Sequence, residues 1–146
     1  MSYFASNEMK KDGGSIVNLA SINGFVGYNQ GIDSNLKGIN PYPHSKGGVI
    51  QLTKDMAVGL AKQNIRVNAL SAGPVKTLAG AAISGARHVF RYSENVSPLK
   101  FNPQLKEIGC GALYLTSDLS SGVTGNVHHV DGGLHSVAIP KQENLE

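Results

Sequence analysis

The chain has 146 residues, of which 40% are hydrophobic and 16% are charged, so it suits one domain with a hydrophobic core and is short for two. The net charge of +3 comes from lysines and arginines scattered along the chain, which argues against nucleic-acid binding. The single cysteine excludes an intramolecular disulfide, and no apolar run is long enough for a signal peptide or a membrane span. These features predict a soluble cytoplasmic protein.

The first part of the chain carries the pattern of a strand, a helix and a second strand. Residues 1–11 are compatible with the end of a helix, and residues 15–20 are a short run rich in β-branched and apolar side chains that predicts a buried strand. A glycine-rich irregular connection follows over residues 21–41. From residue 43 to residue 62 the spacing of apolar side chains predicts an amphipathic helix, and residues 65–70 predict the next strand. This order predicts a right-handed parallel crossover.

The rest of the chain predicts two helical segments and a third strand. The segment after the second strand is helix-compatible over residues 78–91 but rich in glycine, and we expect a mobile lid there. Asn102-Pro103 has the form of a cap followed by proline at the first helical position, so a helix is predicted from there to about Thr116. Residues 126–130 predict a strand, ended by the turn at 131–133.

Three parallel strands with covering helices predict an α/β fold. The expected architecture is a partial doubly wound, Rossmann-like parallel sheet without its amino-terminal strands. The dinucleotide-binding motif GxGxxG does not occur in the sequence. The chain is therefore expected to correspond to the part of such a fold that follows the phosphate-binding turn.

A tyrosine and a lysine at the start of the long predicted helix are the first candidates for chemistry. Tyr42 and Lys46 are four residues apart, so their side chains share one face of the helix. A nearby ammonium favours the phenolate and moves the pKa of a tyrosine towards neutrality, where it exchanges protons with a substrate oxygen. Ser21, at the carboxyl end of the preceding strand, is placed to hydrogen-bond the same oxygen. The alternative is that Tyr42 and Lys46 are an ordinary surface pair.

The segments GSIVNLASINGFVG, YPHSKGGVIQLTK and IRVNALSAGPVKT, in this order, resemble the second half of the short-chain dehydrogenase/reductase core. The resemblance runs from about Lys10 to Ala138. It implies that residues 1–146 are the carboxyl-terminal half of a single Rossmann-like domain, and that the cofactor is NAD or NADP. In that family the tyrosine is the general acid or base, the lysine lowers its pKa and holds the nicotinamide ribose, and the serine orients the substrate oxygen. The resemblance assigns catalysis to Ser21, Tyr42 and Lys46, and cofactor contacts to Tyr42, Lys46, Gly73, Pro74, Val75 and Thr77.

The family resemblance leaves two activities open. Residues 66–138, with SAGPVKTLAG, NVSPLK and LYLTSDLSSGVTGNVHHVDGG, resemble bacterial enoyl-acyl-carrier-protein reductases, which reduce an enoyl thioester in fatty acid synthesis. Those enzymes place the tyrosine seven residues before the lysine, where this chain has Ile39. Tyr42 instead occupies the position used by carbonyl and alcohol oxidoreductases. Because the proton donor lies closest to the reaction, our first expectation is hydride transfer to or from a carbonyl or alcohol, with enoyl reduction as the alternative.

Substrate contacts and assembly are the next expectations. Phe90 and Tyr92 lie in the predicted lid, where contact with an acyl or apolar substrate and packing in the core are equally compatible with their side chains. The resemblance implies a homo-dimer or homo-tetramer. A third hypothesis is that the chain is an inactive truncated fragment that only associates, because the strand edge beside residues 16–19 would expose unpaired backbone and apolar surface.

Three histidines near the carboxyl terminus raise the question of a metal site. His128 and His129 are adjacent on a predicted strand, so their side chains point to opposite faces and cannot easily bind one ion. His135 adds a third imidazole, but without a cysteine or a coordinating spacing we expect no metal. Asp131 is expected to hold the turn that ends the strand.

Overall fold

The computed structural model describes residues 2–27, 39–77 and 85–139, and these residues form an α/β fold. The longer elements are α1 (Ser2–Met9), β1 (Gly14–Ser21), α2 (Pro41–Leu60), β2 (Ile65–Ala72), α4 (Ala86–Val96), α5 (Leu105–Thr116) and β3 (Val127–Val130). Short 3-10 helices follow several of them: η1 (Ile22–Gly24), η3 (Ala61–Gln63), η4 (Asp118–Ser120) and η5 (Leu134–Ser136).

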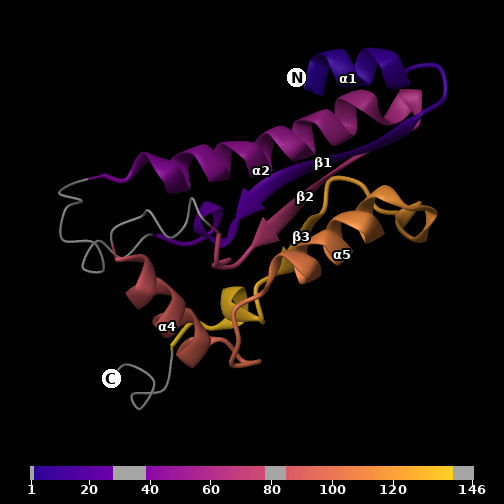
Figure 1. Cartoon of the computed structure of the whole chain (residues 1–146). Coiled ribbons are helices and arrows are strands. Elements are labelled where there is room, and N and C mark those ends of the chain that lie inside the picture. The colour runs from indigo at the N-terminus through magenta and orange to yellow at the C-terminus, as the bar shows by residue number, and fades with distance from the viewer. Residues whose placement is uncertain (1, 28–38, 78–84, 140–146) are drawn as a thin grey trace.

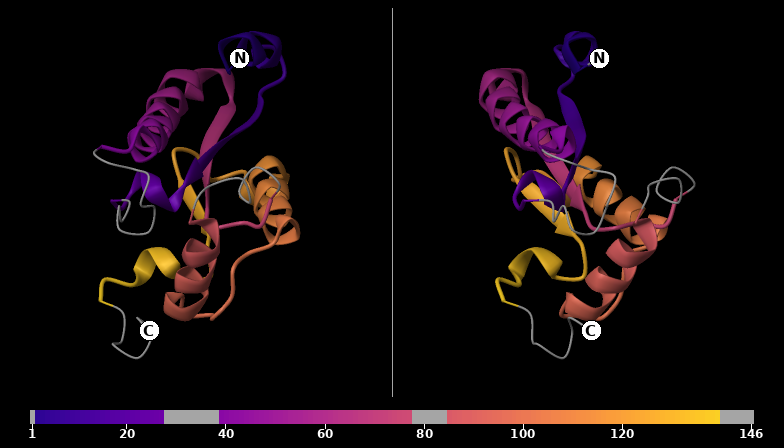
Figure 2. Two further views of the ribbon diagram at one scale, coloured as in Figure 1. Left: turned by 60° about the vertical axis from the view of Figure 1, so that its left-hand side comes forward. Right: turned by 90° about the vertical axis from the view of Figure 1, so that its left-hand side faces the viewer.

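The three described strands form one parallel sheet in the order β1-β2-β3. In Figures 1 and 2, α2 lies on one side of this sheet and α5 on the other. Packing agrees, because Ile50 of α2 clusters with Ala69 of β2, whereas Gly111 of α5 lies against Leu70, the next residue along the strand. The predicted fold class, a partial Rossmann-like sheet, is confirmed.

Helix α2 begins at Pro41, two residues before the predicted start. The side chain of Asn40 accepts a hydrogen bond from the backbone N–H of Tyr42 at 2.9 Å, and proline suits the first helical position because it has no N–H to satisfy. Buried Thr53 fixes the helix on the sheet, since its Oγ1 accepts from Asn18 Nδ2 of β1 at 3.0 Å. Among the described residues no helix, α2 included, is long and apolar enough to cross a membrane.

The predicted start of α5 is wrong by two residues. Asn102 does not cap this helix, because its Nδ2 donates to the carbonyl oxygen of Phe90 in α4 at 2.7 Å and its Oδ1 accepts from Ser93 Oγ. The helix begins instead at Leu105, and the carboxylate of Glu107 accepts from the backbone N–H of Gln104 at 2.7 Å. A tertiary contact to α4 thus outweighs the local capping signal.

Helix α4 also departs from the prediction. Residues 78–84, with the first part of the predicted lid helix, lie outside the described residues. The described helix runs from Ala86 to Val96 and therefore continues past Arg91, where the helical pattern was expected to end. Buried Ser93 and Val96 explain the extension, because they attach its last turn to the rest of the molecule.

The connection from α5 to β3 is held by two polar side chains of β2. The guanidinium of Arg66 donates to the carbonyl oxygen of Leu115 at 3.0 Å and to Ser120 Oγ at 2.9 Å. Buried Asn68 donates from Nδ2 to the carbonyl oxygen of Val123 at 2.8 Å and accepts from the N–H of Asn126 at 3.0 Å. These bonds hold the segment before β3 against β2, and so they fix the position of β3 along the sheet.

Candidate active site

The strands of a parallel sheet end at a common edge, and the predicted site residues gather there. Ser21 closes β1 and is paired in register with Ala72, the last residue of β2, which is in turn paired with Val130, the last residue of β3. In open α/β sheets ligands bind outside the carboxyl ends of the strands. This edge is therefore the candidate active site.

Lys46 ties the start of α2 to the end of β1. Its ammonium donates to the carbonyl oxygen of Leu19 at 2.9 Å, and its Nζ lies 5.6 Å from the centre of the Tyr42 ring. Tyr42 itself is 46% exposed, so its phenol is accessible from solvent. The structure thus brings the tyrosine, the lysine and the end of the serine-bearing strand together, as the sequence predicted; their catalytic roles stay predictions.

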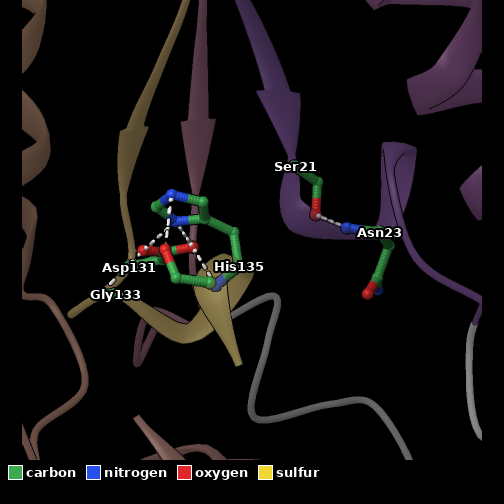
Figure 3. A network of polar contacts seen from close by, with 6 residues as sticks. Ser21, Asn23, Asp131, Gly133 and His135 are labelled. Carbon is green, nitrogen blue, oxygen red and sulfur yellow. Dashed lines mark hydrogen bonds and ion pairs between the residues drawn. The ribbon is translucent and has the colours of Figure 1, made fainter. Parts of the chain in front are cut away.

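Ser21 is held in place by the short helix that follows it. The residue is 8% exposed, and its Oγ accepts from the backbone N–H of Asn23 at 3.2 Å (Figure 3). Helix η1 then lies directly on α2, because a Cβ added to Gly24 would meet the backbone carbonyl carbon and oxygen of Lys46 at 3.0 Å. Only a residue without a side chain allows this approach. The contact between η1 and α2 therefore positions both Ser21, which precedes η1, and Lys46, which lies on α2.

The turn after β2 carries the residues predicted to bind cofactor. Gly73 donates its N–H to the carbonyl oxygen of Val130 at 2.9 Å, and a Cβ at Gly73 would lie 2.9 Å from Asp131 Cα. The turns after β2 and β3 therefore touch. Pro74, Val75 and Thr77 follow along this edge as half-buried residues outside regular structure. Their contact with cofactor stays a prediction.

Phe90 and Tyr92, the predicted substrate contacts, lie on α4. The two residues are two positions apart on a helix, so their side chains point in different directions. Phe90 is half-buried, whereas Tyr92 is 41% exposed. They do not form a single surface, and substrate contact by either one stays a prediction.

A cluster that the sequence patterns did not assemble lies beside the same edge (Figure 3). Buried Asp131 accepts from the backbone N–H groups of Gly133 at 2.9 Å and His135 at 3.0 Å, and its carboxylate lies 2.9 Å from His135 Nδ1. The rings of His129 and His135 stack with centres 3.9 Å apart, and Phe25 lies 4.9 Å from the His129 ring. The expected turn-holding role of Asp131 is confirmed.

The environment of His129 lowers the pKa of its imidazole below the usual 6.5. Burial contributes most and the charge of His135 adds to it, while Asp131 acts in the opposite direction. His128 points to the other face, where its ring lies 5.6 Å from that of Tyr114 in α5. The expectation that His128 and His129 face opposite ways is confirmed. The sequence signal for this cluster was the pair Gly132 and Gly133. Their positive φ angles of 65° and 83° reverse the direction of the chain after β3, so that the His135 ring lies against the His129 ring.

A parallel sheet with a serine at the end of one strand and the YxxxK pair at the start of the next helix is the arrangement of a short-chain dehydrogenase/reductase. A family model described as enoyl-(acyl carrier protein) reductase matches residues 1–135, and the chain belongs to this family.

Relatives and solved structures agree with this assignment. The NADH-type enoyl-acyl-carrier-protein reductase 1 of Rhizobium meliloti (strain 1021) is 40% identical over 134 residues, which are 92% of this chain and 46% of the relative. The crystal structure of FabI from Candidatus Liberibacter asiaticus matches with a TM-score of 0.78 and 40% identity, covering 88% of this chain and 47% of that one. A gluconate 5-dehydrogenase from Burkholderia cenocepacia J2315, in complex with NADP and tartrate, matches with a TM-score of 0.75 and 27% identity over 92% of this chain and 49% of that one. The chain spans about half the length of these relatives.

Proposed function

We propose that the chain is part of an NAD(P)-dependent oxidoreductase that reduces the enoyl double bond of an acyl thioester carried by acyl carrier protein. The observation that carries the proposal is the family match over residues 1–135, together with 40% identity to an enoyl-acyl-carrier-protein reductase. It reverses the order of the two activities expected from the sequence, where the position of Tyr42 favoured carbonyl or alcohol chemistry. We also propose that residues 1–146 are the carboxyl-terminal half of one Rossmann-like domain, since they match about half of each relative.

The described residues fit a nicotinamide cofactor at the carboxyl edge of the sheet. An ammonium has three donors, and the bond to Leu19 occupies one, so Lys46 retains donors for ribose hydroxyls. Gly73 has no side chain because Asp131 occupies that space, and this contact holds the turn after β2 at the edge where the nicotinamide would lie. When bound, the cofactor supplies a hydride to the substrate.

The roles of the chain's own side chains follow from this placement. Tyr42 donates a hydrogen bond to the thioester oxygen and so stabilises the enolate that forms as the double bond is reduced. Lys46, whose Nζ lies 5.6 Å from the centre of the Tyr42 ring, holds the nicotinamide ribose beside the phenol. Ser21, held by Asn23 at the end of β1, orients the same substrate oxygen.

An assay with crotonyl and acetoacetyl thioesters of acyl carrier protein tests the proposal. We would assay the chain itself and a hybrid protein, in which the chain is joined to the portion of the Rhizobium meliloti relative that it does not match. We expect the hybrid to reduce the crotonyl substrate with NADH or NADPH and to leave the acetoacetyl substrate unchanged. Reduction of acetoacetyl thioester alone would contradict the proposal.

One observation favours carbonyl or alcohol oxidation and reduction as a second candidate. Tyr42 is four residues before Lys46, and the position seven residues before it holds Ile39, which is 83% exposed and has no proton to give. The similarity to a gluconate 5-dehydrogenase supports the same candidate. Activity of the hybrid towards acetoacetyl thioester or simple alcohols, without crotonyl reduction, is the outcome this candidate predicts.

Location and assembly belong to the same proposal. We propose a cytoplasmic homo-dimer or homo-tetramer, as the family resemblance implies. Helix α2 supports an assembly because it leaves two apolar side chains exposed, Leu52 at 49% and Val58 at 81%. Analytical ultracentrifugation of the chain and of the hybrid measures the number of copies, and a monomer in both would contradict this part of the proposal.

A further inference from the structure

The side chains of Asp131, His135 and Ser136 form a continuous row of hydrogen bonds beside the carboxyl edge of the sheet. The Asp131 carboxylate lies 2.9 Å from His135 Nδ1 (Figure 3), and the other nitrogen of the same ring, Nε2, lies 3.1 Å from Ser136 Oγ. Both distances are within hydrogen-bond reach. The order carboxylate, imidazole, hydroxyl is that of a nucleophilic serine, its base and the group that orients the base.

The hydrogen-bonding capacity of the three groups decides where their protons lie. An ionised carboxylate only accepts hydrogen bonds, so His135 Nδ1 carries the ring proton and donates to Asp131. In the neutral imidazole Nε2 is then an acceptor, and the Ser136 hydroxyl donates to it. This tautomer, assigned from the partners of the ring, is the one in which Nε2 takes a proton from the serine.

Contacts on two sides hold the His135 ring in this orientation. The Asp131 side chain is 1% exposed and accepts from the backbone N–H groups of Gly133 at 2.9 Å and His135 at 3.0 Å. The ring of His129 stacks on that of His135 with centres 3.9 Å apart and planes inclined by 13°. The lowered pKa of His129 keeps this second ring neutral, so positive charge that forms on His135 meets no neighbouring imidazolium.

The hydroxyl of this group is open to solvent, whereas its carboxylate is buried. Ser136 and His135 are exposed residues, so a small substrate can reach Ser136 Oγ. Phe25 is 49% exposed, and its ring lies 4.9 Å from that of His129, which stacks on His135. This aromatic side chain offers an apolar contact to a short acyl group near the hydroxyl.

We propose that Ser136 is the nucleophile of a second activity, the hydrolysis of short acyl esters with a stable leaving group, with His135 as the base and Asp131 orienting it. Ser136 Oγ attacks the carbonyl carbon and its proton passes to His135 Nε2. The bond from that carbon to the leaving oxygen breaks, and the leaving group departs with this proton. Water then attacks the acyl-serine, giving a proton to His135 that returns to Ser136 Oγ as the carboxylic acid is released. Neither the Tyr42 and Lys46 pair nor a nicotinamide cofactor takes part.

The burst of para-nitrophenol released from para-nitrophenyl acetate tests the proposal on the complete chain without cofactor. The variants are Ser136→Ala, His135→Gln and Asp131→Asn, and the matched controls are Ser121→Ala and His88→Gln, which replace exposed residues elsewhere. We expect no burst in Ser136→Ala, a burst rate lowered at least about tenfold in His135→Gln and Asp131→Asn, and no change in the controls. The ester concentration at half the maximal burst rate should stay within a few-fold in Asp131→Asn, because this side chain orients the base and does not bind the acyl group.

Covalent labelling identifies the reacting oxygen. A fluorophosphonate forms a phosphonyl ester with an activated serine as fluoride leaves, and mass spectrometry of the digested chain locates the label. We expect label on Ser136 in the wild type and in Ser121→Ala, formed at least about tenfold more slowly in His135→Gln. The His135 side chain is 35% exposed, so this variant will fold even if Asp131→Asn does not. Equal bursts from the wild type and Ser136→Ala, or no label on Ser136, would overturn the proposal and leave the group as a hydrogen-bonded turn only.

Discussion

At the level of single residues, Tyr42 and Lys46 contribute to the proposed reaction in different ways. Lys46 is anchored to β1 through Leu19, whereas the phenol of Tyr42 is exposed at the sheet edge. We expect Tyr42→Phe to lower kcat of the hybrid protein about 100- to 10,000-fold, because the hydrogen-bond donor is lost. Its stability should hardly change.

The matched control for Tyr42→Phe is Ser45→Ala. The Ser45 hydroxyl donates to the carbonyl oxygen of Tyr42 at 2.7 Å and lies on the exposed side of the same helical turn. We expect this variant to retain kcat within a few-fold. If both variants lost activity equally, the effect would reflect the helix end rather than the phenol.

His129 makes stability depend on pH. Its pKa is lowered from 6.5 in the folded chain, so below 6.5 the unfolded chain binds more protons and the free energy of unfolding falls as pH falls through the lowered pKa. We expect urea denaturation to show lower stability at about pH 5.5 than at about pH 8. His129→Asn should reduce this difference and His88→Gln, on the exposed face of α4, should not. An unchanged pH dependence in His129→Asn would contradict the assignment.

At the level of elements, the contact between η1 and α2 positions the candidate site. A Cβ at Gly24 would lie 2.6 Å from Ile50 Cδ1 and 3.0 Å from the Lys46 backbone. We expect Gly24→Ala to lower the free energy of unfolding by about 1–3 kcal/mol, because backbone cannot move aside as a side chain can.

The control for Gly24→Ala is Gly48→Ala, within α2. No atom lies within 4 Å of a Cβ added there, and replacing a helical glycine by alanine stabilises a helix by up to about 1 kcal/mol. In urea denaturation, the free energy of unfolding should therefore fall for Gly24→Ala and rise for Gly48→Ala. Equal effects would show that η1 can shift away from α2 without cost.

At the level of the whole molecule, β1 is an edge strand of the sheet that the described residues form. In the described residues β1 pairs only with β2, and Leu19 is 58% exposed at this edge. The sequence also lacks the GxGxxG loop, which in Rossmann folds binds the pyrophosphate at a helix amino terminus. Because of these two features, cofactor binding is the measurement that separates an active chain from an inactive one.

Fluorescence titration with NADH and NADPH measures that property. We expect saturation by the hybrid at micromolar concentrations and weak binding, unsaturated at millimolar concentrations, by the 146-residue chain. The lost contacts to the pyrophosphate account for the difference. Saturation of the chain alone at micromolar concentrations would contradict this expectation, whereas no binding even by the hybrid would favour the hypothesis of an inactive chain that only associates.

Local patterns along the sequence were sufficient for the elements and for part of the site. The periodicity of residues 43–62 and the short apolar runs predicted α2 and the three described strands. Such patterns are visible in the sequence because an element that buries one face repeats apolar residues at its own period. The spacing of Tyr42 and Lys46 is likewise local, since one helical turn sets it.

Contacts between distant segments were decided only by the tertiary structure. Asn102 bonds to α4 instead of capping α5, and the carboxylate of Asp131 meets His135 and the stacked ring of His129 after a turn through two glycines. No periodic pattern encodes these contacts, because they depend on strand register and on where the chain returns. The sequence by itself determined the family, the sheet and the Tyr42–Lys46 pair, and the fold decided what surrounds them.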